Sequence, residues 1–240
     1  IFIDTLRPDH MSLYGSERPT TPKLETWAAD AAVFENARSI APWTLPSTRS
    51  MLTGHIPERW GTVPTLQDQL SDIGWATSFV AGNVYLSSNF DMSNDWSEHR
   101  CINWPQAEVQ VDRALEFIQT NPNRDAFVLL HLMDMHLPYT EPRKYKGRFA
   151  GPRPASLSKD DFHRSEVMKA DLTDDDKQYI RDRYDQNLAY IDDQIARFME
   201  ALPEDATIMV VSDHGEEFWD HGDFEHGHTL YDELLRIPMV

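Results

Sequence analysis

Short, continuously apolar runs alternate along this chain with longer stretches in which apolar residues recur every three or four positions. The continuous runs predict strands buried on both faces, and they cover residues 1–4, 75–81, 126–132 and 206–211. The periodic stretches predict helices over residues 22–32, 64–73, 108–119 and 174–202. Because strands alternate with helices, we predict an α/β fold in which a large, mostly parallel, mixed sheet lies between helix layers.

Two stretches lack this periodicity. Residues 82–105 are irregular and polar, and residues 141–171 are rich in proline and charge, which predicts a surface excursion or a lid over the site. One large domain, 1–240, accounts for the length better than two small ones. The chain starts inside a strand and stops at 237–240 in the opening of another, so we expect a segment of a longer protein whose C-terminal part is missing.

The stretch Ala41–Gly54 (APWTLPSTRSMLTG) presents one hydroxyl residue, Thr44, just ahead of a helix-competent run. Pro46 suits the first helical turn, because its missing N–H would be unpaired there anyway. The free N–H groups and positive dipole end of such a helix would point back toward Thr44, where an anionic oxygen would be held. Thr44 is therefore a candidate nucleophile or anion contact. The alternative for this stretch alone is an ordinary threonine N-cap with nothing bound.

The chain is strongly acidic, with a net charge of −18 and 40 acidic residues against 22 basic ones. This balance argues against nucleic acid as a partner, because phosphate binding needs a basic surface. The acidic surface is also poor in lysine, which is typical of a protein that works in high salt, where self-repulsion is screened. A merely acidic protein from ordinary conditions is the alternative.

Cys101 is the single cysteine, which excludes an internal disulfide and a cysteine-based metal cluster. A lone cysteine fits a reducing compartment, so a cytoplasmic location is favoured for this segment. No apolar run approaches the length of a membrane span.

Three predicted strands lead directly into candidate metal ligands. Asp4 ends the first strand, Asp134 and His136 follow the third, and Asp213-His214 follows the fourth. The carboxyl ends of strands gather at one edge of an open α/β sheet, where such side chains can converge on one divalent metal. The alternatives are a turn-initiating aspartate at position 4 and a capping aspartate with a polar loop histidine at 213–214.

Four of the ten histidines fall within fifteen residues, at 214, 221, 226 and 228. A histidine-rich tract often binds metal, although it can also be a solvated loop. We expect one or two of these imidazoles to take part in the site.

Five sequence blocks, in the right order and over nearly the whole chain, resemble the sulfatase family of the alkaline phosphatase superfamily. They are IDTLRPDH, TTPKLETWAADAAVFENA, APWTLPSTRSMLTGHIP, HLMDMHLPY and the terminal SDHGEEFWDHG with HGHTLYDELLRIP. The resemblance implies an α/β sandwich around a large mixed sheet. It also implies that Asp4, Asp213 and His214 hold a divalent metal, which the nucleophile Thr44 also coordinates.

The same resemblance implies that His136 contacts the transferred sulfate or phosphate group and that His226 lies near a further basic contact. We assign Thr44, His136 and His226 to catalysis. The candidate substrate-binding residues are Arg49, His136, His226 and His228.

Two departures from the family pattern shift the expected chemistry. Sulfatases proper carry Cys or Ser at the nucleophile position, followed by x-Pro-x-Arg, and convert it to formylglycine. Here a threonine stands at that position and Arg49 comes one residue late. Threonine cannot become formylglycine by that route, so the usual sulfatase mechanism is not implied.

The second departure concerns the metal ligands. Asp4-Thr5 stands where many sulfatases have two adjacent aspartates, and Asp213-His214 stands where calcium-binding sulfatases often have Asp-Asn. Imidazole favours zinc or manganese, with calcium or magnesium as alternatives. Both departures point toward phosphoryl-transferring members such as phosphodiesterases, phosphonate hydrolases and phosphoglycerol transferases.

We therefore predict a metal-dependent hydrolase or transferase of small-molecule phosphate or sulfate esters, with phosphodiester, phosphonate or phosphoglycerol substrates favoured. The metal would lower the pKa of the Thr44 hydroxyl, and His136 and His226 would neutralise charge or protonate the leaving group. Two alternatives stay open: a true sulfuric ester hydrolase that uses Thr44 directly, and a catalytically silent binding domain on the same fold.

Overall fold

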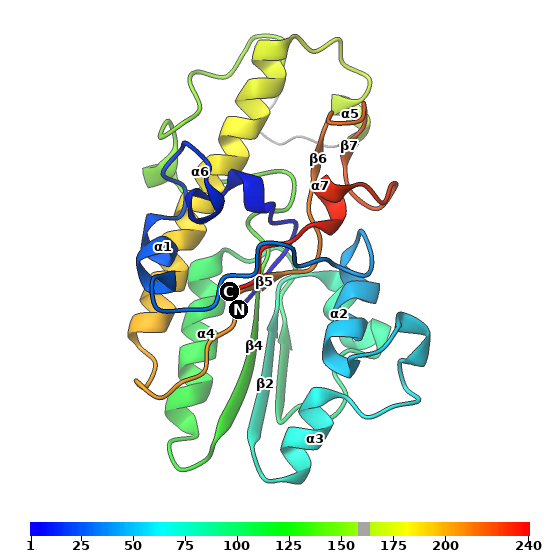
Figure 1. The fold of residues 1–240 in the computed structure, drawn as a ribbon, viewed down its shortest axis with the longest axis vertical. Helices are drawn as coiled ribbons and strands as arrows, with labels where there is room; N and C mark the ends of the chain where they lie inside the picture. The colour runs from blue at the N-terminus through cyan, green and yellow to red at the C-terminus, as the bar shows by residue number, and fades with distance from the viewer. Residues whose placement is uncertain (158–163) are drawn as a thin grey trace.

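The computed structural model describes residues 1–157 and 164–240, and the strands of this part form a parallel sheet and a small hairpin (Figure 1). The sheet has the order β3-β2-β4-β1-β5, with every neighbouring pair parallel. Its strands are β1 (Phe2–Ile3), β2 (Ala76–Ala81), β3 (Glu98–Cys101), β4 (Ala126–Leu132) and β5 (Val211–Ser212). The antiparallel hairpin consists of β6 (Glu217–Phe218) and β7 (Phe224–Glu225). This arrangement confirms the predicted α/β class.

The chain end makes the sheet mixed, as predicted. Val210 and Val240 exchange backbone hydrogen bonds of 2.9 Å each, and Val211 forms an antiparallel bridge with Met239. The residues from 238 to 240 therefore run antiparallel beside β5.

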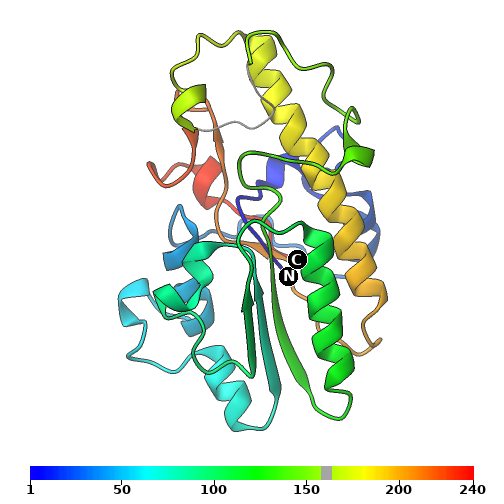
Figure 2. The same cartoon turned by 180° about the vertical axis from the view of Figure 1, so that it is seen from behind.

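Helices cover both faces of the sheet, and Figure 2 shows α4 and α6 packed together on one of them. On that face lie α1 (Pro22–Ala28), α4 (Ala107–Thr120) and α6 (Asp174–Glu200). On the other face lie α2 (Thr44–Thr53) and α3 (Leu66–Asp72). Two single-turn helices, α5 (Arg164–Val167) and α7 (Asp232–Leu235), lie near the hairpin.

Alternate residues of the strands enter two separate hydrophobic cores. Val80 and Leu130 belong to the larger core, which includes α4 and α6, whereas Phe79 and Leu129 belong to the smaller core beneath α2. Every residue of β2 is consequently buried, as its continuous apolar run predicts.

The helix that carries Thr44 begins at this residue itself. Trp43, with an extended backbone, holds the N-cap position, and Gly54 ends the helix with a left-handed φ of 67°. The N-cap interpretation of Thr44 is therefore wrong. Its hydroxyl turns toward the ends of the strands instead.

Three further expectations need correction. The stretch 82–105 contains β3, which the pattern missed because this edge strand (EHRC) has a polar sequence and is only partly buried. The strand predicted at 206–211 is reduced to Val211–Ser212. From the helical periodicity of 174–202, the carboxylates of α6 are expected on a solvated face, but Asp176, Asp185 and Asp192 are buried and hydrogen-bonded.

The stretch expected as a surface excursion or lid is partly anchored in the core. Tyr145 and Leu157 are buried, and Arg164 donates to the carbonyl of Phe224 in β7 at 2.8 Å. This stretch therefore packs beside the hairpin. The part of it at 158–163 lies outside the described residues.

Candidate active site and metal centre

The pairing of β1 with β5 brings two carboxylates together at the carboxyl end of the sheet. The residues that directly follow the paired ends are Asp4 and Asp213, and both are buried. Asp213 Oδ1 accepts the backbone N–H groups of Thr5, at 3.2 Å, and His214, at 2.9 Å. Parallel register thus fixes both side chains at one point.

Thr5 makes the turn that holds this pair in place. Its φ of 55° lies in the left-handed region, which is strained for a β-branched residue. Its hydroxyl donates to the carbonyl of Met135 at 2.8 Å, and its carbonyl accepts from the Tyr184 hydroxyl at 2.7 Å. The surrounding core therefore maintains a backbone conformation that the residue alone would not favour.

α2 presents the Thr44 hydroxyl to the same point. Thr44 Oγ1 lies 3.5 Å from Asp4 Oδ2 and 3.4 Å from His214 Nε2. His214 Nε2 in turn lies 3.2 Å from Asp213 Oδ2 and 3.5 Å from Asp4 Oδ1. The structure therefore brings together the four residues that the family resemblance implied as ligands, from three separate parts of the chain.

The hydrogen bonds of these groups leave lone pairs that face a common point. Asp4 Oδ1 and Asp213 Oδ2 are buried and accept no hydrogen bond from the described part of the chain. His214 Nδ1 lies 2.8 Å from the Gly215 carbonyl oxygen, so Nδ1 carries the hydrogen and the Nε2 lone pair faces the carboxylates. Three oxygens and one imidazole nitrogen in this arrangement fit a divalent cation such as zinc or manganese.

The electrostatics agree with this fit. Burial opposes the charged form of His214, but the carboxylates of Asp213 and Asp4 raise its pKa to about 9. Burial also acts against ionised Asp4, yet a hydrogen bond from His131 and the charges of nearby histidines hold the pKa of that carboxyl well below its usual range. This centre therefore attracts positive charge, and a metal cation can take the place of the proton on His214.

His131 lies in the same centre and was missed in the sequence. One ligand atom each of Asp4, His131 and Asp213 lies within 4.8 Å of the others, and His131 Nε2 is 3.4 Å from Asp4 Oδ2. However, the backbone N–H of Gly82 points at His131 Nδ1, at 3.3 Å, so Nε2 carries the hydrogen. In this tautomer His131 Nε2 points a hydrogen toward Asp4 and offers no lone pair to a cation. Within the apolar run of β4, nothing in the sequence singled it out.

Asn83 was also missed, although the sequence offered a signal. Its Nδ2 donates to Asp4 Oδ2 at 3.1 Å and to Thr44 Oγ1 at 3.3 Å. Asn83 comes two residues after the end of β2, at the same sheet edge as the ligands. The argument that identified Asp4, that side chains just after the carboxyl ends of parallel strands converge, would also have identified Asn83.

His136 and His226 extend the site as a series of neighbouring rings. The His226 centroid lies 4.4 Å from that of His214 and 4.8 Å from that of His136. Glu216 Oε1 lies 2.8 Å from His226 Nδ1, and the Tyr139 hydroxyl donates to Glu216 Oε2 at 2.8 Å. Glu216 therefore fixes the orientation of the His226 ring.

Burial also sets the charge on this part of the site. Burial, with His214 and His136 nearby, holds the pKa of His226 well below its usual value, so the ring is neutral. Burial raises the pKa of Glu216 to about 7. With Nδ1 donating to Glu216, the Nε2 of the neutral ring is able to accept a proton.

Arg49 and His228 make other contacts. Arg49 donates to the carbonyl of Phe90 at 2.9 Å and lies over the Trp60 ring, 5.3 Å from its centroid. Five residues beyond Thr44, an α-helix has turned by about 140°, so the Arg49 side chain leaves α2 on a different side from the Thr44 hydroxyl. His228 Nε2 lies 2.8 Å from the buried carboxylate of Glu217. These contacts do not support the expected roles of Arg49 and His228 in substrate binding.

His221, the remaining histidine of the tract, lies 2.5 Å from Glu233 Oε1 and stacks on Tyr231. Two of the four imidazoles, His214 and His226, thus lie at the centre itself.

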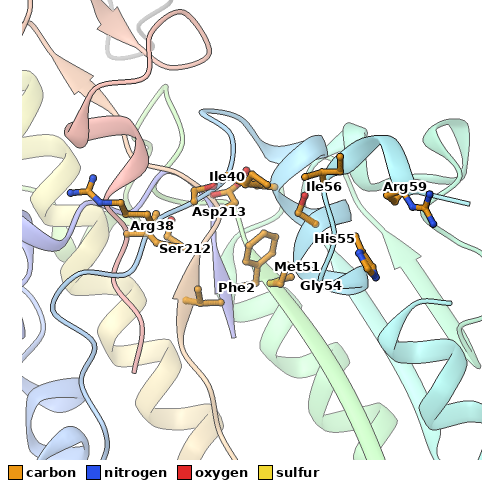
Figure 3. A pocket seen from close by; sticks show the side chains of 15 residues that line it. Phe2, Arg38, Ile40, Met51, Gly54, His55, Ile56, Arg59, Ser212 and Asp213 are labelled. Carbon is orange, nitrogen blue, oxygen red and sulfur yellow. Dashed lines mark hydrogen bonds between the residues drawn. The ribbon is translucent and has the colours of Figure 1, made fainter. Parts of the chain in front are cut away.

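A cavity of about 740 Å³ lies beside this centre, between α2 and β5 (Figure 3). Its lining is largely apolar and includes Phe2, Ile40 and Met51. Asp213 borders it, but Thr44 and His214 do not. The cavity is therefore separate from the place where a transferred group would meet the hydroxyl.

Comparison with known proteins gives a family match over the full length. A family model described as Sulfatase matches residues 1–240. The uncharacterized sulfatase YidJ of Escherichia coli (strain K12) is 22% identical over 304 residues, covering 100% of this chain and 61% of that protein. The Kdo(2)-lipid A phosphoethanolamine 7''-transferase of the same strain is 26% identical over 257 residues, covering 99% of this chain and 42% of that protein. The chain thus spans less than two thirds of these relatives.

A solved structure shares the fold. The C-terminal periplasmic domain of EcEptC from Escherichia coli, in complex with Zn, matches with a TM-score of 0.75 and 19% identity, covering 99% of this chain and 71% of that chain. Among the helices of the described residues, none combines the length and apolar character that a membrane span requires.

Proposed function

The chain belongs to the sulfatase family, and from this premise we propose that it is a metal-dependent enzyme that cleaves or transfers phosphate esters with Thr44 as nucleophile. The position of the Thr44 hydroxyl carries the proposal. Oγ1 lies at the N-terminus of α2, 3.5 Å from Asp4 Oδ2 and 3.4 Å from His214 Nε2. A buried hydroxyl between carboxylates and an imidazole lone pair fits a nucleophile that a cation activates.

Asp4, Thr44, Asp213 and His214 would hold the cation. When bound there, a divalent metal would lower the pKa of the Thr44 hydroxyl and offset the charge on the transferred group. Zinc or manganese suits the mixed oxygen and imidazole donors better than calcium or magnesium does.

In the first step, Thr44 Oγ1 attacks phosphorus in line with the ester oxygen. The Oγ1–P bond forms, the P–O bond to the leaving group breaks, and the threonine proton passes to solvent. The departing oxygen takes a proton from His136 or from water. The free N–H groups in the first turn of α2 stabilise the non-bridging oxygens.

In the second step, water, or an acceptor alcohol in a transferase, attacks the phosphothreonine; the Oγ1–P bond breaks, and Oγ1 takes a proton from solvent to restore the Thr44 hydroxyl. His226 accepts the proton of this nucleophile at Nε2, because its Nδ1 is committed to Glu216 at 2.8 Å. The low pKa of the His226 ring, set by burial, keeps that nitrogen unprotonated at neutral pH.

Threonine favours phosphate over sulfate as the transferred group. It cannot be converted to formylglycine by the route that serves Cys or Ser, so an alkoxide must attack directly. The phosphoethanolamine transferase among the relatives gives a family precedent for moving a phosphorus-containing group. A true sulfuric ester hydrolase that uses Thr44 directly is the competing proposal.

We also propose a location outside the cytoplasm. The solved relative that contains Zn is described as a periplasmic domain, which disfavours the cytoplasmic location expected from the single cysteine. One cysteine is compatible with either compartment, because it has no partner within the chain.

Thr44→Ala tests the nucleophile. Turnover of an aryl phosphodiester should fall by about 10³-fold or more, because an activated nucleophile cannot be replaced by a methyl group. Metal content should fall little, since three ligands remain. Thr53→Ala, which removes a hydroxyl at the other end of α2, is the matched control and should keep its activity. Full activity in Thr44→Ala would end the proposal.

The transferred group and the metal are tested together. An aryl phosphodiester and the matching aryl sulfate are compared with Zn²⁺ and with Mn²⁺, and the phosphodiester should give the higher kcat/KM. A higher value for the sulfate would support the sulfuric ester hydrolase instead. If no divalent metal binds even when supplied, the silent binding domain gains support and this proposal fails.

A further inference from the structure

Three segments around the nucleophile carry no charged residue, although the protein has a net charge of −18 and 26% charged residues. They are residues 40–48, 82–90 and 101–107, which contain no Asp, Glu, Lys, Arg or His. The segments come from the loop into α2 and from the loops after β2 and β3. In a chain this acidic, loops without any charged side chain are unexpected unless they contact something other than water.

Hydrogen bonds and a ring contact join these segments beside the candidate metal centre. The N–H of Trp104 donates to the Gly82 carbonyl at 3.1 Å, which sets the loop after β3 against the loop after β2. The next residue, Asn83, donates to Thr44 Oγ1. Trp43 directly precedes Thr44, and its ring meets the Tyr85 ring at a centroid distance of 5.5 Å.

The exposed side chains of these segments form what we call the apolar rim. Each member leaves between 38% and 49% of its surface in contact with solvent. The members are Trp43, Val84, Tyr85, Ile102 and Trp104.

Two of the rings of this rim are held by the site and its surroundings. Trp104 stands edge-on against His136, with centroids 4.9 Å apart at 90°. Tyr85 packs against Phe90 as well as Trp43, with centroids 5.1 Å apart. Rings fixed in this way lose little conformational entropy when a ligand covers them.

We propose that the apolar rim binds the organic portion of the ester and that this portion is apolar, either an aryl ring or an alkyl chain. Clustered exposed aromatic and aliphatic side chains around a reaction centre mark a surface that a ligand covers. A charged organic group would find no ion-pair partner within the three segments. The inference rests on the proposed function, since it assumes that the ester is attacked by Thr44.

Turnover of substrates that share one leaving group tests whether the apolar rim binds the organic portion. p-Nitrophenyl phosphodiesters with methyl, phenyl or octyl as the second substituent differ only in the organic portion that stays on phosphorus. The wild-type protein should use the phenyl or the octyl ester with a kcat/KM about tenfold above that of the methyl ester. Trp43→Ala and Trp104→Ala should lower kcat/KM more for the preferred ester than for the methyl ester.

A matched pair of variants controls for surface effects. Ile102→Ala belongs to the rim, whereas Ile73→Ala removes an even more exposed isoleucine, at the end of α3. Only Ile102→Ala should reduce the preference for the larger ester. Equal effects of the two variants would contradict the proposal.

Binding provides a readout that does not depend on turnover. Methyl, phenyl and octyl phosphate are titrated into the zinc-loaded chain by calorimetry, and phenyl or octyl phosphate should bind about tenfold more tightly than methyl phosphate. Preference for phenyl identifies a ring site, and preference for octyl identifies an alkyl site. Equal affinity for all three phosphates would overturn the proposal that the apolar rim binds the organic portion, while leaving the proposed function intact. If Thr44→Ala stays fully active, the proposed function fails. The binding titration then still shows whether the apolar rim binds an apolar group.

Discussion

At the scale of single residues, backbone contacts decide which histidine can bind a metal. His131 and His214 both direct Nε2 toward the same carboxylates. Gly82 N–H occupies Nδ1 of His131, whereas the Gly215 carbonyl receives Nδ1–H from His214. His131 therefore points an N–H toward Asp4 Oδ2, 3.4 Å away, whereas His214 offers a lone pair. Residue type alone would treat the two rings as equivalent.

Asp134 is a second residue whose surroundings determine its chemistry. Burial raises its pKa to about 7, partly offset by the backbone N–H of Ala107. Its Oδ2 accepts no hydrogen bond within the described residues. The folded state thus favours the protonated acid.

Asp134→Asn should stabilise the protein above neutral pH. The unfolded carboxyl ionises near its ordinary pKa of 3.8, whereas the folded one ionises near 7, so wild-type stability falls as pH rises between these values and then levels off. Asparagine removes this loss while retaining an acceptor for Ala107. We expect a gain of about 1–2 kcal/mol in the free energy of unfolding at pH 8 and a smaller gain at pH 5.

Urea unfolding at the two pH values measures this gain. Asp30→Asn removes the same charge from an exposed site and should change stability by less than about 0.5 kcal/mol at either pH. A gain for Asp134→Asn that does not depend on pH would argue against a raised pKa as its cause.

At the scale of elements, α6 organises its neighbours through buried carboxylates. Asp185 lies 2.6 Å from His10 Nδ1 and accepts from Arg18 at 2.8 Å. Asp192 accepts the backbone N–H groups of Lys23 and Leu24, in the first turn of α1, at 3.0 and 2.8 Å. Thr21, which holds the N-cap position of α1, makes no capping bond with its side chain. A carboxylate from another helix therefore caps α1.

Asp192→Ala should destabilise the protein by about 1–2 kcal/mol, because two N–H groups at the start of α1 lose their acceptor. Asp192→Asn keeps one acceptor oxygen and should lose less. Glu200→Ala, an exposed carboxylate on the same helix, is the control and should have little effect. Equal urea midpoints for Asp192→Ala and the wild-type protein would show that this cap contributes nothing.

At the scale of the whole molecule, net charge opposes compactness. Forty acidic residues against 22 basic ones give a charge of −18 at pH 7, and the sequence pI is about 4.8. Several ion pairs, such as Arg7 with Asp9 and Asp220, offset part of this repulsion locally. The remaining surface repulsion acts over distances that salt can screen.

Thermal stability should therefore rise with salt. Between 0.1 and 1 M NaCl the Debye length falls from about 10 to about 3 Å, so Tm should increase by several degrees at pH 7. The same titration at pH 5, close to the pI, is the control, because little net charge remains to be screened. A Tm at pH 7 that stays constant or falls with salt would contradict this expectation and remove the case for adaptation to high salt.

The sequence by itself determined the α/β class, most of the strands and the four residues that meet at the candidate metal centre. These features depend on local patterns. An apolar run predicts a buried strand, and a parallel sheet gathers the residues at its carboxyl ends, such as Asp4 and Asp213, without further information. Thr44, the fourth residue, was identified because the five family motifs occur in the family's order along the chain.

Only the tertiary structure decided the remaining features, because they depend on contacts between segments far apart in the chain. β3 and Asn83 lie in a stretch without hydrophobic periodicity, and His131 lies in a run whose apolar neighbours conceal it. The contacts of Arg49 with Phe90 and Trp60 became visible only once the direction of α2 was known. A hydrogen-bond partner contributed by another element leaves no trace in local sequence, and such partners set the protonation, orientation and role of each side chain in the centre.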